Sequence, residues 1–122
     1  MGIRISLAAL CGSLIAIAPP LQAETPAELD ALARATATPT AGIALARRQV
    51  AAGDMLDALA TLERVILNNP QSNEARLLHA AVMCRLDDRQ GAMVELDQVR
   101  GRQIADAAWA EANEACSDGR ER

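Results

Sequence analysis

Apolar residues from position 41 onward recur at every third or fourth position, the spacing that places side chains on one face of an α-helix. Ala58, Leu62 and Val65 follow the spacing i, i+4, i+7. The chain has no stretch rich in Thr, Val and Ile with period two, so we expect no β-strands. The pattern predicts an all-α domain with helices at residues 41–52, 55–67, 73–86 and 89–99, a further helix carrying Ala105, Ala108, Trp109, Ala112 and Cys116, and a short helix that opens at Pro26.

Turn signals separate the predicted helices. Gly53-Asp54 and Asp87-Asp88 lie between the members of two helix pairs, and Asn68-Asn69-Pro70 ends the first pair because proline cannot continue a helix. Ser72 or Asn73 can cap the helix that follows. We expect an N-terminal segment at residues 24–40 that closes with a linker at 36–40, a helical domain at residues 41–117 and a polar tail at residues 118–122.

An internal repeat relates the two helix pairs. Shifting the sequence by 34 positions superposes residues 39–72 on residues 73–106. The matching pairs are Ala41 with Ala75, Ala46 with Ala80, Asp54 with Asp88, Ala58 with Ala92, Leu62 with Leu96 and Val65 with Val99. Because each pair falls where helix packing requires it, the sequence predicts two similar helical hairpins.

With this repeat, the chain resembles the tetratricopeptide repeat (TPR) family over about residues 39–106. The most specific residues are Gly53-Asp54 followed by Ala58, Leu62, Val65 and Pro70. The resemblance implies helical hairpins stacked as two TPR-like repeats. We expect the C-terminal helix to cap them and to bury Trp109, the largest apolar side chain. A generic helical bundle is the alternative fold.

The resemblance also implies a concave, ligand-facing side formed by the first helix of each hairpin. On this sequence, that side holds Ile43, Arg47 and Val50 from the first hairpin and Leu77, Ala81, Cys84 and Arg85 from the second. An apolar surface with Arg47 and Arg85 projecting over it would suit an extended or helical peptide that carries carboxylates. The alternative is that both arginines are ordinary solvated residues. A disulfide at Cys84 would also place the C-terminal helix over part of this side.

The first 23 residues have the pattern of a secretory signal peptide. Arg4 precedes an apolar run over residues 5–18, Pro19-Pro20 ends any helix, and a polar segment follows Ala23. The run is shorter than the roughly 20 apolar residues that a transmembrane helix needs. We therefore expect a periplasmic or secreted protein with cleavage after Ala23. The alternative is an uncleaved leader that anchors the chain in a membrane.

Removal of the leader would leave Cys84 and Cys116 as an even pair of cysteines. In an exported chain, such a pair favours a disulfide if the two helices lie side by side in the correct register. The bond would clamp the C-terminal helix onto the second hairpin. The alternative is two separate buried thiols. Because the chain has no CxxC sequence, a redox-active role is not expected.

Charge and the remaining polar residues argue against several functional classes. The formal net charge of −4 becomes −5 without Arg4, since 11 of the 12 basic residues then face 16 acidic ones. An acidic chain is poorly suited to nucleic acid. His79 is the only histidine and lacks a metal-ligating residue at i+3 or i+4, so we expect a structural role. No catalytic constellation or phosphate-binding loop occurs, and we expect no cofactor.

The sequence therefore predicts a binding protein rather than an enzyme. The leading hypothesis is an adaptor or assembly helper in the cell envelope that holds another protein or a peptide. A second hypothesis is self-association into a homodimer through the open ends of the hairpin stack. A third is a small module that regulates or inhibits an exported enzyme.

Overall fold

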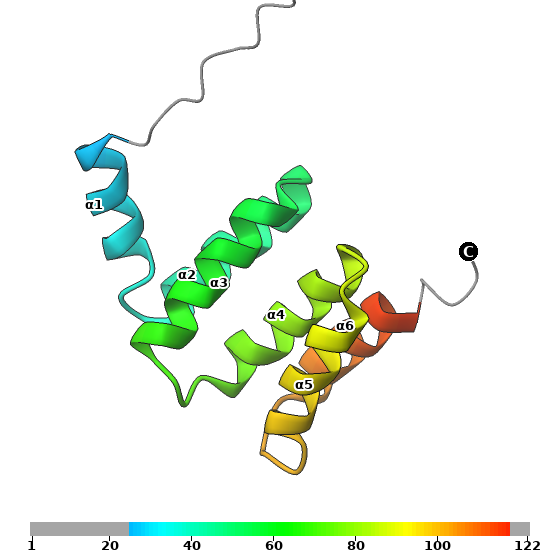
Figure 1. Ribbon diagram of the computed structural model, residues 1–122. Helices are drawn as coiled ribbons and strands as arrows, with labels where there is room; N and C mark the ends of the chain where they lie inside the picture. Colours follow the sequence, from blue (N-terminus) through cyan, green and yellow to red (C-terminus); the bar gives the residue numbers. More distant parts are fainter. Residues whose placement is uncertain (1–24, 118–122) are drawn as a thin grey trace, which may run out of the picture.

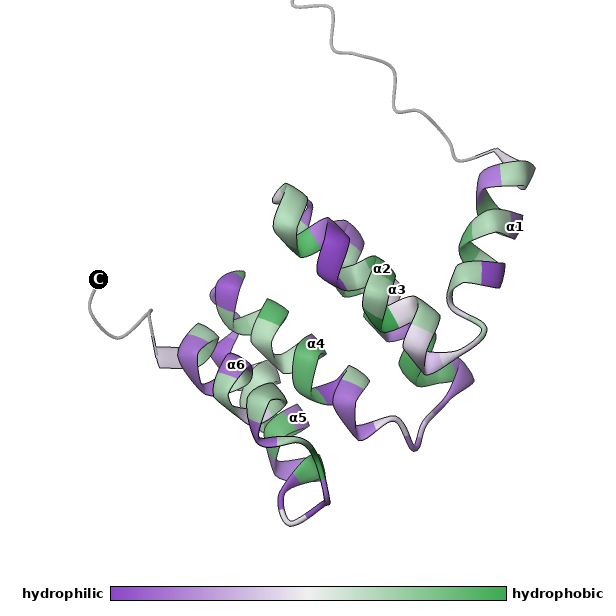
Figure 2. Ribbon diagram, turned by 180° about the vertical axis from the view of Figure 1, so that it is seen from behind, coloured by the Kyte–Doolittle hydropathy of each residue, from purple (hydrophilic) through white to green (hydrophobic). Residues whose placement is uncertain are grey.

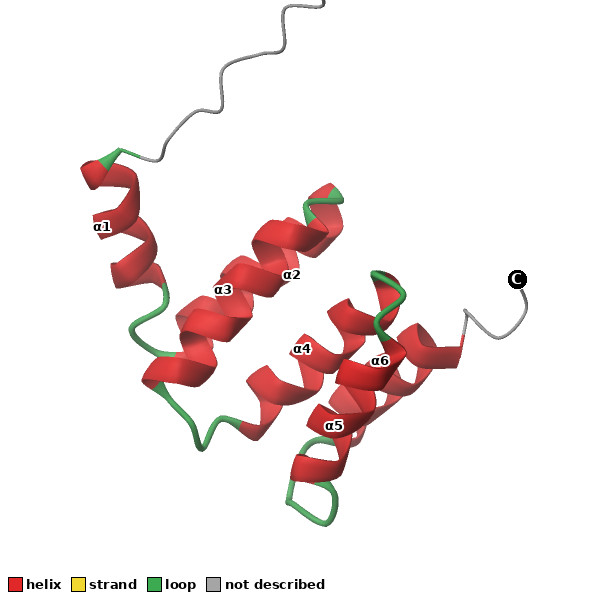
Figure 3. Cartoon of the chain, viewed as in Figure 1, coloured by secondary structure: helices red, strands yellow, loops and turns green. Residues whose placement is uncertain are grey.

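The computed structural model describes residues 25–117, where it consists of six α-helices and contains no strand (Figures 1 and 3). The prediction of an all-α fold is confirmed. The helices are α1 (Pro26–Ala35), α2 (Pro39–Ala52), α3 (Met55–Asn68), α4 (Asn73–Arg85), α5 (Arg89–Val99) and α6 (Asp106–Ser117). Over this range, none of the helices is long and apolar enough to cross a membrane. The predicted leader (1–23) and polar tail (118–122) lie outside the described residues.

Capping side chains define where the first two helices begin. Thr25 and Glu28 form a capping box at α1, in which each side chain accepts the backbone N–H of the other residue. The Thr38 hydroxyl accepts a backbone N–H three residues on, and Pro39 occupies the first turn of α2. Helix α2 therefore begins at Pro39, which shortens the expected linker (36–40) by two residues.

The hairpins α2–α3 and α4–α5 turn in the same way. Gly53 ends α2 with φ 87°, and Asp87, at the corresponding position of the second hairpin, has φ 67°. Left-handed backbone favours glycine, and Asp is among the few other residues that adopt it readily. Ser72 caps α4 as Thr38 caps α2, again at corresponding positions of the repeat. The turns and caps thus follow the period seen in the sequence.

Small and aliphatic side chains at matching positions form the core. The buried pairs are Ala46 and Ala80, Ala58 and Ala92, Leu62 and Leu96, and Val65 and Val99. Ala41 is exposed, although its counterpart Ala75 is fully buried. Gly42 of α2 lies so close to Val65 of α3 that a Cβ at Gly42 would overlap the valine side chain. Because the chain has no Phe or Tyr, the core depends on helix backbones that approach closely.

The order of helix packing changes at the C-terminal end. Helix α2 packs on α3, α3 on α4 and α4 on α5, whereas α6 packs on α4 and makes little contact with α5. Helix α1 lies at the opposite end of the molecule and contacts mainly α2 (Figure 1). Colouring by hydropathy shows apolar residues spread over the packed helices and a hydrophilic connection between α3 and α4 (Figure 2). Helix α6 thus does not follow α5 as α4 follows α3, and one side of α5 stays uncovered.

Candidate functional site

The predicted ligand-facing side is largely closed in the structure. Of its residues, Ile43, Leu77 and Ala81 are buried with exposed fractions of 7%, 1% and 1%, Val50 is half-buried, and Arg47 and Arg85 are exposed. Leu77 and Ala81 lie on the same face of α4 as Cys84, to which α6 is covalently bonded. Because α6 packs on α4, these two residues are not accessible to a partner while α6 stays in place.

Arg47 ties α2 to its neighbours instead of projecting over an open apolar surface. One guanidinium nitrogen donates to Glu111 of α6, and the other lies 3.6 Å from Glu74 of α4. Arg47 and Ile43 border a small hollow of about 220 Å³ that Arg85 does not line. The structure therefore does not bring the two predicted arginines together over one binding surface.

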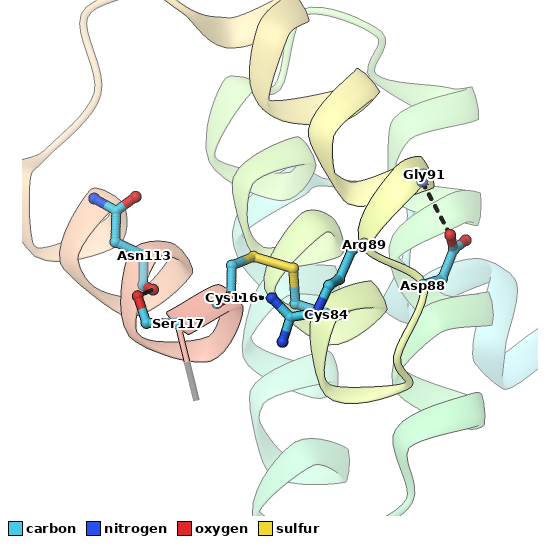
Figure 4. Close-up of a disulfide and its surroundings, with 7 residues drawn as sticks. All are labelled: Cys84, Asp88, Arg89, Gly91, Asn113, Cys116 and Ser117. Atoms are coloured by element: carbon cyan, nitrogen blue, oxygen red, sulfur yellow. Dashed lines mark hydrogen bonds between the residues drawn. A yellow bond between two sulfur atoms is a disulfide. The ribbon is translucent and has the colours of Figure 1, made fainter. Parts of the chain in front are cut away.

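Cys84 and Cys116 form a disulfide with a Cα–Cα distance of 5.0 Å (Figure 4), which confirms the predicted pair. The bond joins the last turn of α4 to the last turn of α6. Arg89, the first residue of α5, donates a hydrogen bond of 2.6 Å to the Cys116 carbonyl. Carbonyls in the last turn of a helix lack partners within the helix, so this bond satisfies one of them. The ends of three helices meet here.

A groove of about 740 Å³ lies between α5 and α6, beside this disulfide. It is lined by Cys84 from α4, by Arg89, Met93, Leu96 and Arg100 from α5 and the residue after it, and by Trp109, Asn113, Cys116 and Ser117 from α6. Trp109 was expected to be buried in the cap, but it is only half-buried because it forms part of this open wall. The only tryptophan of the chain therefore belongs to a surface groove.

The groove was not predicted from the sequence, although the sequence contains a signal for it. Arg89, Met93, Leu96 and Arg100 follow the spacing i, i+4, i+7, i+11, which places them along one face of α5. Polar side chains at both ends make this stripe look like an ordinary boundary between core and solvent. The sequence does not show that α6 makes little contact with α5 and so leaves the stripe open.

No family model, characterised protein or solved structure matches the chain significantly. In residues 25–117, no three His, Cys, Asp or Glu side chains gather in a way that could hold a metal ion. The groove combines apolar side chains with two arginines, a composition typical of surfaces that bind other proteins.

His79 of α4 is buried between side chains of three helices. Its Nε2 lies 3.9 Å from Glu63 of α3, and its Nδ1 lies 3.8 Å from Glu95 of α5. Arg76 of α4 pairs with the same Glu95 at 3.1 Å. Neither ring nitrogen has a hydrogen-bond partner in the described residues. Burial lowers the pKa of His79, the two carboxylates oppose this effect, and Arg76 adds to it.

We expect the leucine variant His79→Leu to raise the free energy of unfolding by about 1 kcal/mol at pH 7, because it replaces a buried polar ring without partners. Since the folded pKa lies below the unfolded value of about 6.5, the unfolded chain binds the proton first. Wild-type stability should therefore be complete above about pH 6.5 and fall as the pH decreases towards the folded pKa. Urea unfolding between pH 7.5 and pH 5.5 measures this loss.

The glutamine variant His79→Gln is the matched control for this pH dependence. It keeps a polar side chain in the core but removes the titrating group. The free energy of unfolding of this variant should therefore depend less on pH than that of the wild type, and it should stay below that of His79→Leu. Wild-type and leucine curves that run parallel between pH 7.5 and pH 5.5 would show that His79 does not govern this response.

Proposed function

We propose that the chain is an exported, non-catalytic binding module that holds a segment of another protein. The leader-like pattern of residues 1–23 supports export, and so does the Cys84–Cys116 disulfide, because such bonds persist in oxidising compartments. Two hairpins whose turns, caps and buried residues recur at corresponding positions support a TPR-like arrangement. Repeats of that kind offer extended surfaces for protein binding.

The groove between α5 and α6 carries this proposal. It combines Trp109 and Met93 with Arg89 and Arg100, which are residue types enriched where proteins bind one another. Met93 is 50% exposed, so its apolar surface is available to a partner. Covering the groove would remove the thioether and the indole from water, which favours association.

Self-association is the second candidate, and a different set of surfaces favours it. Helix α1 has no residue buried against the rest of the described chain. Leu56 and Leu67 of α3 are 71% and 81% exposed. Large apolar side chains of this kind can be covered by a second copy of the chain. The two candidates therefore use different faces, and a site-specific probe can separate them.

A photoactivatable crosslinking residue at Met93 is expected to capture a distinct partner protein in intact cells. The same residue at Leu56 is the matched control, since Leu56 is more exposed than Met93 but lies on α3 and outside the groove. The partner adduct should form from position 93 only. An adduct with twice the mass of the chain would instead identify self-association. Absence of any adduct at position 93, or identical adducts at both positions, would contradict the proposal.

A further inference from the structure

The stripe on α5 has a charged residue at each end and apolar residues between. Arg89 and Arg100 are 11 positions apart, which corresponds to about 16 Å along a helix. Met93 and Leu96 lie between them on the same face, and all four residues line the groove. The groove therefore contains an apolar strip about three helical turns long, with an arginine at each end.

The internal repeat shows what kind of element this face accepts. The residues of α3 that correspond to the α5 stripe are Met55, Leu59, Leu62 and Ile66. In the first hairpin, α4 packs on α3, and both Leu59 and Ile66 pack against the core. In the second hairpin, α6 packs on α4 instead, and Met93, the counterpart of Leu59, is 50% exposed. The place that a helix occupies beside α3 is thus open beside α5.

The charge of the groove is opposite in sign to the net charge of the chain. The chain carries a net charge of −4, yet the residues that line the groove include two arginines and no carboxylate. One guanidinium nitrogen of Arg89 binds the Cys116 carbonyl, and the other is buried and has no partner among the described residues. Arg100 pairs with Asp97 at 2.6 Å, but both side chains are largely exposed, so this pair is weak. Arg100 can thus take a carboxylate from outside, and the buried Arg89 guanidinium adds positive charge at the other end of the groove.

We propose that the groove binds an acidic amphipathic helix of another protein. The helix lies along α5 as α4 lies along α3. Its aliphatic ridge covers Met93, Leu96 and Trp109. A carboxylate at one end pairs with Arg100, and a carboxylate at the other end lies in the positive field of the buried Arg89 guanidinium. This inference rests on the proposed function of the groove, and it adds the secondary structure and the charge of the partner segment.

A pair of synthetic peptides tests the inference. The acidic peptide is a designed helix with Glu at positions i and i+11 and Leu at i+4 and i+7, the complement of the α5 stripe, and it contains no tryptophan. The basic peptide is identical except for Lys in place of the two Glu. Because Trp109 is the only aromatic residue of the chain, intrinsic fluorescence reports directly on the groove. We expect the acidic peptide to shift this emission and to bind roughly tenfold more tightly than the basic one.

The charge-reversal variant Arg100→Glu should bind the acidic peptide roughly tenfold more weakly than the wild type does and bind the basic peptide more tightly. Arg48→Glu is the matched control, since Arg48 is an exposed arginine of α2 outside the groove. That variant should leave both affinities unchanged. Equal affinities for the two peptides, no change in emission with either, or the same response in both variants would overturn the inference. An emission shift that follows chain concentration alone would also overturn it, because a second copy would then fill the groove.

The crosslinking experiment separates the two levels of failure. If position 93 captures a partner but the acidic peptide has no advantage over the basic one, the groove is a binding site and the acidic helix is wrong. If position 93 captures nothing and neither peptide binds, the proposed function of the groove fails together with the inference.

Discussion

Replacing both cysteines of the disulfide with serine is expected to lower the free energy of unfolding by about 3–4 kcal/mol. Cys84 and Cys116 are separated by 32 positions. Closing a loop of that length lowers the conformational entropy of the unfolded chain, which stabilises the fold by about 3–4 kcal/mol. Guanidinium denaturation of the wild type and of the double variant Cys84→Ser/Cys116→Ser, followed by circular dichroism, measures the difference. This loss is large compared with the total stability expected of a small domain.

Helix α6 should be the part of the structure that depends most on the bond. Ala112 and Ala115 are its only buried residues, so apolar burial alone holds it weakly against α4. Trp109 emission should therefore move to longer wavelength in the serine variant before the hairpins unfold.

Reductant provides the control for the disulfide experiment. It should destabilise the wild type to a similar degree and leave the serine variant unchanged. A difference of less than about 1 kcal/mol between the oxidised wild type and the serine variant would show that the bond does not clamp the fold.

The helices of the hairpins could be predicted because their signals are local. Apolar spacing placed Ala58, Leu62 and Val65 on one face, and all three are fully buried. Proline and capping residues set the helix ends to within two residues, since φ and hydrogen-bond donors are properties of a few neighbouring positions. The disulfide could be proposed because Cys84 and Cys116 each lie on the apolar stripe of a helix.

The position of α6 could be predicted only in part, and the candidate site changed with it. The expected Cys84–Cys116 bond places α6 beside α4, but no local signal shows that α6 makes little contact with α5. Whether α6 packs on α4 or α5 depends on contacts between distant segments, such as the pairing of Arg47 with Glu111. Because α6 packs on α4, it covers Leu77 and Ala81 and leaves Met93 open. The sequence predicts a ligand-facing side that the C-terminal helix covers only in part, through the Cys84–Cys116 bond, and it predicts a buried Trp109.

The close approach of α2 and α3 leads to the second large effect. We expect the alanine variant Gly42→Ala to lower the free energy of unfolding by about 2 kcal/mol, within the usual range for an overpacked core. This direction is opposite to helix propensity, by which alanine is favoured over glycine by about 1 kcal/mol. A Cβ at Gly42 would overlap Cγ2 of Val65, and it would lie 3.5 Å from the Thr36 Cα. Val65 is fully buried and stiff at χ1, so it cannot turn away.

Gly91→Ala is the matched control, because Gly91 is also a helical glycine with a crowded Cβ position. Its nearest neighbour is the terminal methyl of Met83, together with the carboxylate of Asp88. Met83 has three rotatable bonds and can shift. A small rotation of the Asp88 carboxylate relieves the second contact while the carboxylate still accepts the Gly91 N–H. We therefore expect a change within about 0.5 kcal/mol at this position. Similar losses for both glycines would mean that the contact with Val65 is not the cause.

A second substitution can show that the Gly42 effect arises at Val65. Val65→Ala alone removes buried methyl groups and should cost about 2 kcal/mol. In the double variant Gly42→Ala/Val65→Ala, the new methyl group occupies the space that the valine leaves. The double variant should therefore lose at least about 1 kcal/mol less than the sum of the two single losses. Additive losses would show that the effect of Gly42→Ala does not arise at Val65. A strong coupling would show that glycine at position 42 is what allows α2 and α3 to pack closely in a core without Phe or Tyr.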